Sequence, residues 1–575
     1  MFLFSKEQKS LMDSKGRTRR SKRLRQKDNA SNPDQSELFE GLEIDDGYVK
    51  IDSNLLKRLK RDDNKVGNEV NNEVNNEQPI DTDAAINRIY ELFNGAPEYA
   101  DMLIHARPLD NDTIDSISSS LSKNHWHKKM GEMVANIPLE FLALQRTDAY
   151  TQDYEYRYKP ACQPRVTNQY HSGRCWMFAS LNVLRYGLIF KLNLDPKFEF
   201  SASYLFFWDK IERSKLFYES IWSLRNHPLD ERYNNALITN DTHIIKDGGY
   251  WNYFQNLVKK YGLMPKSIYN DSYNCLCSDD MNDALIKVLN QDALTARGIE
   301  TRDQFDEYLN ERMNIIYGLV VKFMGEPPTK FDWRYKTECG QYQEIKNLTP
   351  SKFYNVVVPH DTETKMTFIH DPRHPENYYK PHHVEYGTNM VGGETAVFIN
   401  IPIDVMKYGI SESLINGEPV WYACDVGACL DGENGIMDIN RYDYKRVLGV
   451  NTIHSKSDML TTKTSVPSHA MVINGVDMDE PNEDTERTYR KWRIDNSWGC
   501  PDMEWHPDHG CWQMSDDWFD QYVYMAVIDL KYFEEETLRL IMDNKSNPCT
   551  IKPWDAFGVV AINSGCNSCK CQGKK

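Results

Sequence analysis

The sequence has no long hydrophobic run. Nowhere do about 18 apolar residues follow one another, which is the length that a membrane-spanning helix needs. The opening segment, Met-Phe-Leu-Phe-Ser-Lys, has too short an apolar stretch for a secretory signal. Asp13 and the lack of a clear amphipathic stripe argue against an organelle transit peptide. We therefore expect no membrane span and a cytoplasmic location.

The sequence also lacks the dense, even cysteine spacing of a disulfide scaffold. Its 13 cysteines are odd in number and are scattered over 575 residues. This usage favours a reducing compartment. A positive charge balance is missing too, because the formal net charge is −17, which argues against a generally nucleic-acid-binding surface.

The first 112 residues differ from the rest, and we expect them to be a largely disordered extension. Residues 15–27 hold eight basic side chains, and residues 68–77 form a polar repeat with little to bury. The basic run is either a solvated tail or a nuclear address or nucleic-acid contact. Residues 84–94 have the pattern of a short helix that ends at Gly95.

From about residue 113 onward the sequence has a globular texture. Residues 176–190 carry apolar side chains at helical spacing, so we expect a helix there. Residues 469–476 and 489–496 are β-rich, and the second segment alternates as a strand does. An early helix followed by late strands predicts an α+β protein.

Cys175 is a candidate nucleophile because it lies at the start of this predicted helix. Gly173 gives a tight turn just before it, and a helix N-terminus stabilises a thiolate. Gln169 lies six residues upstream, so its side-chain amide and the Cys175 N–H are candidates for the two donors of an oxyanion hole. The competing interpretation is a buried structural cysteine.

A thiolate needs a proton partner, and the sequence offers one much later. His469 opens the first predicted strand, and Asn496 ends the second. An asparagine oxygen can accept the histidine ring N–H, and Trp498 can shield that hydrogen bond from water. The chain order Cys, His, Asn is the one expected for this chemistry. A lone histidine on a strand also has a purely structural interpretation.

At this point the sequence resembles the papain-like cysteine peptidases, in their bleomycin hydrolase and aminopeptidase C branch. The resemblance runs from about residue 113 to residue 561 and rests on motifs that occur in order. They are NQYHSGRCWMFASLN (168–182), FSASYLFFWDK (200–210), DGGYW (247–251), VEYGTNMVGG (384–393), GEPVWYACDVG (417–427), SHAMVINGVD (468–477), KWRIDNSWG (491–499) and WDAFGVVA (554–561).

The resemblance implies a two-lobed papain-like α+β fold and a role for each site residue. Cys175 is implied as nucleophile, His469 as general acid and base, Asn496 as its orienting group and Gln169 as an oxyanion donor. It further implies that substrate contacts Gly248, Gly249 and Trp498, and that no metal or other cofactor is needed. Cys175 and His469 are 294 residues apart, against ~130–150 in ordinary papain relatives. The branch therefore implies a large, mostly helical insertion, roughly over residues 190–350.

The resemblance also implies partners and an activity. Members of the branch are aminopeptidases that form homo-hexamers and act on small peptides with a free N-terminus, because the C-terminal segment lies in the cleft. Here the chain continues beyond Ala561 through residues 562–575, a cysteine-containing extension. The extension is either trimmed, threaded elsewhere or placed so that it occludes the site. An endopeptidase or an autoinhibited enzyme is therefore an alternative to the aminopeptidase.

The extension carries Cys566, Cys569 and Cys571, which are either incidental thiols or part of a metal or redox site. Alternatives of another class are a nucleic-acid-binding role, supported only by the basic run at 15–27, and a catalytically inactive scaffold. Against the scaffold, all four predicted catalytic positions hold competent residues.

Overall fold

The computed structural model describes residues 42–45, 48–51, 107, 109–145, 153–238, 243–359, 362–480, 487–500, 508, 510–544 and 547–558. The chain forms two compact units, residues 1–114 and 115–575. In the first unit, β1 (Leu42–Asp45) pairs antiparallel with β2 (Tyr48–Ile51). The basic run at 15–27, the repeat at 68–77, the predicted helix at 84–94 and the extension at 562–575 lie outside the described residues.

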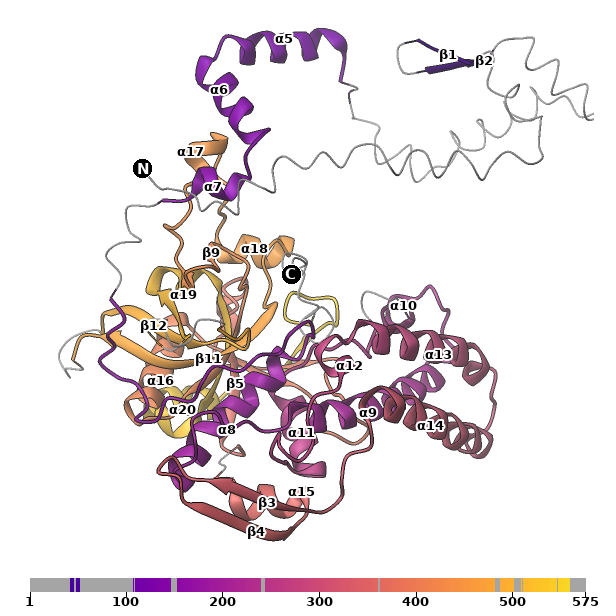
Figure 1. Cartoon of the computed structure of the whole chain (residues 1–575). Helices are drawn as coiled ribbons and strands as arrows, with labels where there is room; N and C mark the ends of the chain where they lie inside the picture. Colours follow the sequence, from indigo (N-terminus) through magenta and orange to yellow (C-terminus); the bar gives the residue numbers. More distant parts are fainter. Residues whose placement is uncertain are drawn as a thin grey trace, which may run out of the picture. The chain divides into compact units, whose positions relative to one another are not determined.

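Helices are spread along the described part of the chain (Figure 1). The described α-helices are α5 (Asn111–Ser122), α6 (His125–Val134), α7 (Leu139–Ala143), α8 (Cys175–Leu192), α9 (Ala202–Ser223), α10 (Arg232–Ile238), α11 (Trp251–Tyr261), α12 (Tyr273–Leu276), α13 (Asp279–Arg297), α14 (Arg302–Met324), α15 (Pro350–Lys352), α16 (Ile403–Ile415), α17 (Tyr444–Leu448), α18 (Lys456–Thr462), α19 (Asp516–Tyr522) and α20 (Glu535–Met542).

Apart from β1 and β2, the described strands form one large mixed sheet and a separate hairpin. The sheet has the order β15-β6-β7-β5-β14-β8-β11-β12-β13-β10-β9, and the hairpin is β3-β4. The strands are β3 (Phe331–Lys336), β4 (Tyr342–Leu348), β5 (Lys365–Ile369), β6 (Pro381–Val384), β7 (Val397–Asn400), β8 (Val420–Cys424), β9 (Leu430–Asp431), β10 (Ile436–Met437), β11 (His469–Met478), β12 (Tyr489–Asp495), β13 (Trp512–Ser515), β14 (Val523–Asp529) and β15 (Cys549–Ile551).

The two faces of the central strands pack into two different hydrophobic cores. Because successive side chains of a strand point to opposite faces, Trp421 and Ala423 of β8 join the core of α8 and the neighbouring helices. Tyr422 and Cys424 join the core on the other face, which α16 and α19 cover. Helices α9, α13 and α14 pack against one another as a helical layer (Figure 1). The predicted α+β class is therefore confirmed.

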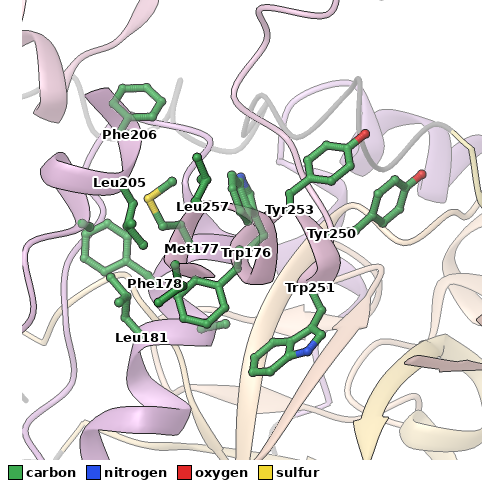
Figure 2. Close-up of a cluster of buried hydrophobic side chains, with 14 of the residues drawn as sticks. Trp176, Met177, Phe178, Leu181, Leu205, Phe206, Tyr250, Trp251, Tyr253 and Leu257 are labelled. Atoms are coloured by element: carbon green, nitrogen blue, oxygen red, sulfur yellow. The ribbon is translucent and has the colours of Figure 1, made fainter. Parts of the chain in front are cut away.

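Helix α8 is the buried centre of the helical core. Most of its residues are apolar, and its buried side chains lie on all sides of the helix. Figure 2 shows Trp176, Met177, Phe178 and Leu181 of α8 beside Leu205 and Phe206 of α9. It also shows Trp251, Tyr253 and Leu257 of α11 and Tyr250, which directly precedes that helix. Asn193 ends the helix in the left-handed conformation, with φ 48°. The helix predicted at 176–190 is present and is slightly longer.

The two strands predicted from the sequence are present as β11 and β12. They pair antiparallel, with Val472 opposite Asp495 and Ile473 opposite Ile494. The range 190–350 holds α9 to α14 and the hairpin β3-β4. That this range is an insertion relative to other peptidases stays a prediction.

Among the described residues, no helix combines the length and the apolar character that crossing a bilayer requires.

Candidate active site

Cys175 is the first residue of α8 and is buried, with 3% of its surface exposed. The residue before it, Arg174, makes no side-chain capping hydrogen bond to the helix. Its guanidinium instead contacts Ser172 Oγ at 2.8 Å and Asp271 at 3.4 Å. Because Cys175 is the first residue of the helix, it lies at the partial positive charge of the helix N-terminus, as the sequence predicted.

The start of α8 contacts β8, the strand that pairs with β11, and β11 begins with His469. Trp421 Nε1 on β8 donates to the Trp176 carbonyl at 3.2 Å. In the sheet, Cys424 of β8 lies directly opposite His469 of β11. Burial raises the pKa of the Cys424 thiol well above its usual value, and the charges of Asp425 and Cys175 add to that rise. These contacts place the start of α8 beside β8, whose last residue, Cys424, lies opposite His469.

His469 is hydrogen-bonded to the predicted asparagine. Its Nε2 lies 2.9 Å from Asn496 Oδ1. An amide oxygen only accepts, so Nε2 carries the proton and Nδ1 has the lone pair that can take a proton from a thiol. Burial lowers the pKa of His469 to about 4, although the bond to Asn496 opposes that shift. A buried imidazolium here therefore needs a negative partner, which a thiolate supplies.

Trp498 lies against this pair. Its ring centroid is 4.9 Å from that of His469 and the two planes are tilted by 43°. A second tryptophan, Trp512, packs edge-on against it at 5.3 Å. Because His469 and Asn496 are both buried, their hydrogen bond is protected from competing water. This is the shielding position predicted for Trp498.

The amide of Gln169 is fixed at both ends. Ser497 Oγ donates to Gln169 Oε1 at 2.6 Å, and Gln169 Nε2 donates to the Ser172 carbonyl at 2.6 Å. The backbone N–H of Gln169 also donates to the Ser497 carbonyl at 2.8 Å. A primary amide has two N–H donors, so one remains to point at a developing oxyanion. The sequence did not assign a role to Ser497, whose only signal was its place directly after Asn496.

The glycine segment 248–249 lies beside the nucleophile helix. Gly248 O accepts a hydrogen bond from Arg213 Nη2 at 2.6 Å. A Cβ at Gly249 would lie 2.6 Å from the indole of Trp176, the residue after Cys175. Glycine at 249 is thus required by close packing against Trp176. The predicted approach of a peptide substrate to this segment stays a prediction.

A segment far along the chain passes next to these glycines. Residues 547–558, here called the C-terminal strap, contain β15, which pairs in parallel with β6. Further along the strap, Tyr250 Oη contacts the carbonyls of Phe557 at 2.7 Å and Gly558 at 3.0 Å as a donor. Tyr250 directly follows Gly249, so Phe557 and Gly558 lie beside the segment predicted to bind substrate.

Charged and aromatic side chains hold the strap along its length. Arg373 forms a two-point contact with Asp555, at 3.1 Å and 3.0 Å, and also pairs with Asp371. Lys552 pairs with Glu385 at 2.7 Å. The ring of Phe557 is fully buried. The motif at 554–561 was recognised in the sequence, but nothing in it indicated these partners.

Among the described residues, no group of three or more His, Cys, Asp or Glu side chains is placed to hold a metal ion. Contacts instead connect His469, Asn496, Trp498 and, through Ser497, Gln169 at the end of β12 and the start of β11. Cys175 begins α8 three residues after Ser172, whose carbonyl binds the Gln169 amide; that its thiol completes the cluster stays a prediction. The predicted cluster contains a thiol, an imidazole, an orienting amide and an amide donor, a set suited to acyl transfer through a thioester.

Comparison with known proteins gives a family for this arrangement. The model of the Peptidase C1-like family matches residues 108–558. Bleomycin hydrolase of Homo sapiens is 36% identical over 405 residues, which span 69% of this chain and 86% of that protein. Aminopeptidase C of Lactobacillus delbrueckii subsp. lactis is 32% identical over 465 residues, which span 80% of this chain and all of that protein.

A solved structure agrees. The crystal structure of PepW from Lactobacillus rhamnosis HN001 superposes with a TM-score of 0.73 at 30% identity, covering 79% of this chain and 99% of that one. The expected papain-like α+β fold is thereby confirmed. The chain therefore belongs to the Peptidase C1-like family, in its bleomycin hydrolase and aminopeptidase C branch, and is a cysteine peptidase.

Proposed function

We propose that this peptidase is an aminopeptidase, which removes residues from the free N-terminus of small peptides. The observation that carries the proposal is the position of the C-terminal strap. Its residues Phe557 and Gly558 are bound by Tyr250, next to the glycines at 248–249. In the proposed enzyme, a chain segment held there limits how far a substrate extends on the N-terminal side of the scissile bond.

The proposed reaction uses the cluster described above. Cys175 gives its proton to Nδ1 of His469, and the thiolate attacks the scissile carbonyl. The resulting oxyanion is held by the Cys175 N–H and the remaining N–H of Gln169. His469 protonates the leaving amine as the C–N bond breaks, which leaves a thioester on Cys175. A water molecule, deprotonated by His469, then hydrolyses the thioester.

Asn496 makes this sequence of proton transfers possible by fixing the histidine tautomer. Because Nε2–H is bound to Asn496 Oδ1, Nδ1 is the ring nitrogen that exchanges protons with the sulfur in the proposed cycle. Rotation of the ring would break a buried hydrogen bond, which costs about 1–3 kcal/mol. Trp498 opposes the same rotation by packing against the ring.

The alternative function is an endopeptidase, and the residues after Ala561 support it. The chain continues past Ala561, so a carboxylate that could receive a substrate amine is absent from that position unless the extension is trimmed. The two activities are separated by comparing a peptide with a free N-terminus against its N-acetylated form. An aminopeptidase cleaves only the free form, and comparable rates on the two would reject the proposal.

The experiment uses the full-length chain and a second chain that ends at Ala561. Mass spectrometry of the purified full-length enzyme shows whether residues 562–575 are removed. If trimming creates the aminopeptidase, the shorter chain has the free-peptide activity from the start and the full-length chain acquires it as the extension is lost.

We further propose a homo-hexamer in the cytoplasm, as the branch implies. Exposed apolar side chains on α6 and α7 support self-association: Trp126 is 60% exposed and Phe141 is 59% exposed. The cysteines in the described part of the chain are all free thiols, which supports a reducing compartment. Light scattering coupled to size-exclusion chromatography measures the assembly. A monomer at working concentration would reject it.

A further inference from the structure

Asp247 has a buried carboxylate, and each of its two oxygens accepts two hydrogen bonds. It is 5% exposed and accepts four hydrogen bonds. Its Oδ2 accepts from the Gly173 N–H at 3.0 Å and from Ser278 Oγ at 2.5 Å. Its Oδ1 accepts from Lys210 Nζ at 2.7 Å and from Asn282 Nδ2 at 2.8 Å. Four donors on one buried carboxylate make a rigid junction between separate parts of the chain.

Two of the groups bound to Asp247 lie on either side of the nucleophile. Gly173, which the carboxylate binds, is two residues before Cys175. Trp176, which follows Cys175, donates its indole N–H to the Asp247 carbonyl at 2.6 Å. Asp247 is also the residue before Gly248 and Gly249. One residue thus connects the turn that carries the thiol to the segment predicted to bind the substrate backbone.

Helix α9 fixes the same loop from its other side. Lys210 donates to the Ile245 carbonyl at 2.5 Å as well as to Asp247. Arg213 donates to the carbonyls of residues 244, 246 and 248 and pairs with Asp209 at 2.7 Å. Lys210, Arg213, Asp209 and Asp247 are all buried, so the two cations are balanced by two anions.

The charge state of Asp247 agrees with this arrangement. Burial alone opposes ionisation, but Lys210 and the hydrogen bonds from Ser278 and Asn282 hold the pKa of the carboxyl well below its usual range. The group is therefore an anion throughout the working pH range. The four donors are buried, so water does not compete with the carboxylate of Asp247 for their hydrogen bonds.

We propose that Asp247 is a positioning residue for the peptidase reaction, because its carboxylate sets the place of the Gly173–Cys175 turn relative to the glycine segment 248–249. The inference rests on the proposed function, since it concerns the same site. Asp247 touches neither substrate nor sulfur in this role. It acts through the Cys175 N–H, whose direction toward the oxyanion is set by the turn.

The energetic reason is the steep distance dependence of oxyanion stabilisation. A donor must lie 2.7–3.1 Å from the oxyanion, and a misplacement of about 1 Å can lower a rate by roughly 10². Attack of the thiolate on a small alkylating reagent needs no oxyanion hole. Loss of the positioning contact should therefore slow peptide hydrolysis much more than alkylation of Cys175.

The test compares Asp247→Asn with a matched control, Asp292→Asn, in the full-length enzyme. Asparagine keeps the shape of Asp247 but places an N–H where an acceptor was. Asp292 is also buried and also paired, with Tyr218 at 2.6 Å and Arg312 at 2.7 Å, but it contacts neither the turn nor the glycine segment. Both variants lose a buried carboxylate, so general destabilisation affects both.

For Asp247→Asn we expect kcat on a free peptide to fall by about 10², while the rate of Cys175 alkylation by iodoacetamide is retained. Asp292→Asn should retain both rates. Ser278→Ala provides a milder variant if Asp247→Asn does not fold. It removes one donor from the same oxygen that binds Gly173, and we expect kcat to fall about fivefold with alkylation retained.

Two results would overturn the proposal. One is an unchanged kcat in Asp247→Asn and Ser278→Ala. The other is a parallel fall of kcat and alkylation, which indicates only a general loss of structure. Failure of the proposed aminopeptidase has a different signature, namely comparable cleavage of the free and the N-acetylated peptide by the wild-type enzyme, and it leaves the role of Asp247 in place. Wild-type peptidase activity that survives complete alkylation of Cys175 would overturn both proposals.

Discussion

Replacing Phe557 by alanine should release the C-terminal strap and open the cleft to substrates with a blocked N-terminus. The ring is fully buried, and it packs against Tyr524 with a centroid distance of 6.4 Å and under the guanidinium of Arg373 at 5.8 Å. Removing a buried phenylalanine side chain costs about 3–5 kcal/mol. The contacts of Lys552 and Tyr250 with their partners are weaker, and the two-point contact of Arg373 with Asp555 is retained in the variant.

The comparison of those contacts gives the expected size of the effect. The Lys552–Glu385 pair is partly exposed and contributes at most about 1 kcal/mol. The Tyr250 hydroxyl adds a similar amount. Loss of the ring should therefore raise the population of released strap by a factor of roughly 10²–10⁴, since each 1.4 kcal/mol is tenfold. Cleavage of an N-acetylated peptide should rise in proportion.

The assay measures kcat/KM on a free peptide and on its acetylated form, together with limited proteolysis of residues 547–558. Phe533→Ala is the matched control, because Phe533 is also buried, at 7% exposure, but packs against Phe368 on the other face of the sheet. It should lower stability without releasing the strap. If the strap of Phe557→Ala becomes protease-sensitive while the acetylated peptide stays uncut, the strap does not determine specificity.

Further predictions concern the catalytic residues and the pH range of stability. Cys175→Ala should abolish turnover with an unchanged circular dichroism spectrum, and residual peptidase activity would contradict its role. Gln169→Ala should lower kcat by about 10²–10³ if it supplies one oxyanion donor, and Ser497→Ala should lower kcat by about fivefold because one hydrogen bond no longer orients that amide. Unchanged steady-state kinetics in either variant would reject the assigned oxyanion hole. His243 is buried, and burial lowers its pKa from 6.5 to about 4 although Asn290 opposes the shift. Between these two values the unfolded chain binds a proton that the folded chain does not, so the free energy of unfolding should fall by about 3 kcal/mol as the pH drops from 6.5 to 4. His243→Gln should remove that part of the pH dependence in urea titrations, and an identical slope in the variant would show that other groups cause it.

The sequence predicted those elements whose pattern is local. The helix that begins at Cys175 and the strands β11 and β12 follow from periodicity within each segment. His469 and Asn496 were predicted as a pair from the motifs around them, and the 2.9 Å contact between them agrees with that interpretation. Such a periodic pattern depends only on the side chains within one segment, so it can be recognised without knowledge of the partner segments.

Contacts between distant segments were not predictable in the same way. Tyr250 binds the carbonyl of Phe557, 307 residues later, and Asp247 binds the Gly173 N–H, 74 residues earlier. These bonds involve a backbone carbonyl or N–H, which every residue has, so no residue type indicates the partner. The order of the eleven strands is hidden for the same reason. Gly249 illustrates a partial success, because the glycine was noticed but its packing against Trp176 was not.

The position of the strap in the chain separates two parts of the proposed enzyme. Every residue of the proposed catalytic cluster precedes residue 499, and the strap follows at residues 547–558. In the proposed function, the segments that carry the reacting groups and the segment that limits their substrates are therefore distant in sequence. β15 joins the sheet only at its edge, through β6, so in the proposed enzyme selectivity can change with this edge while the central strands β8, β11 and β12 stay the same.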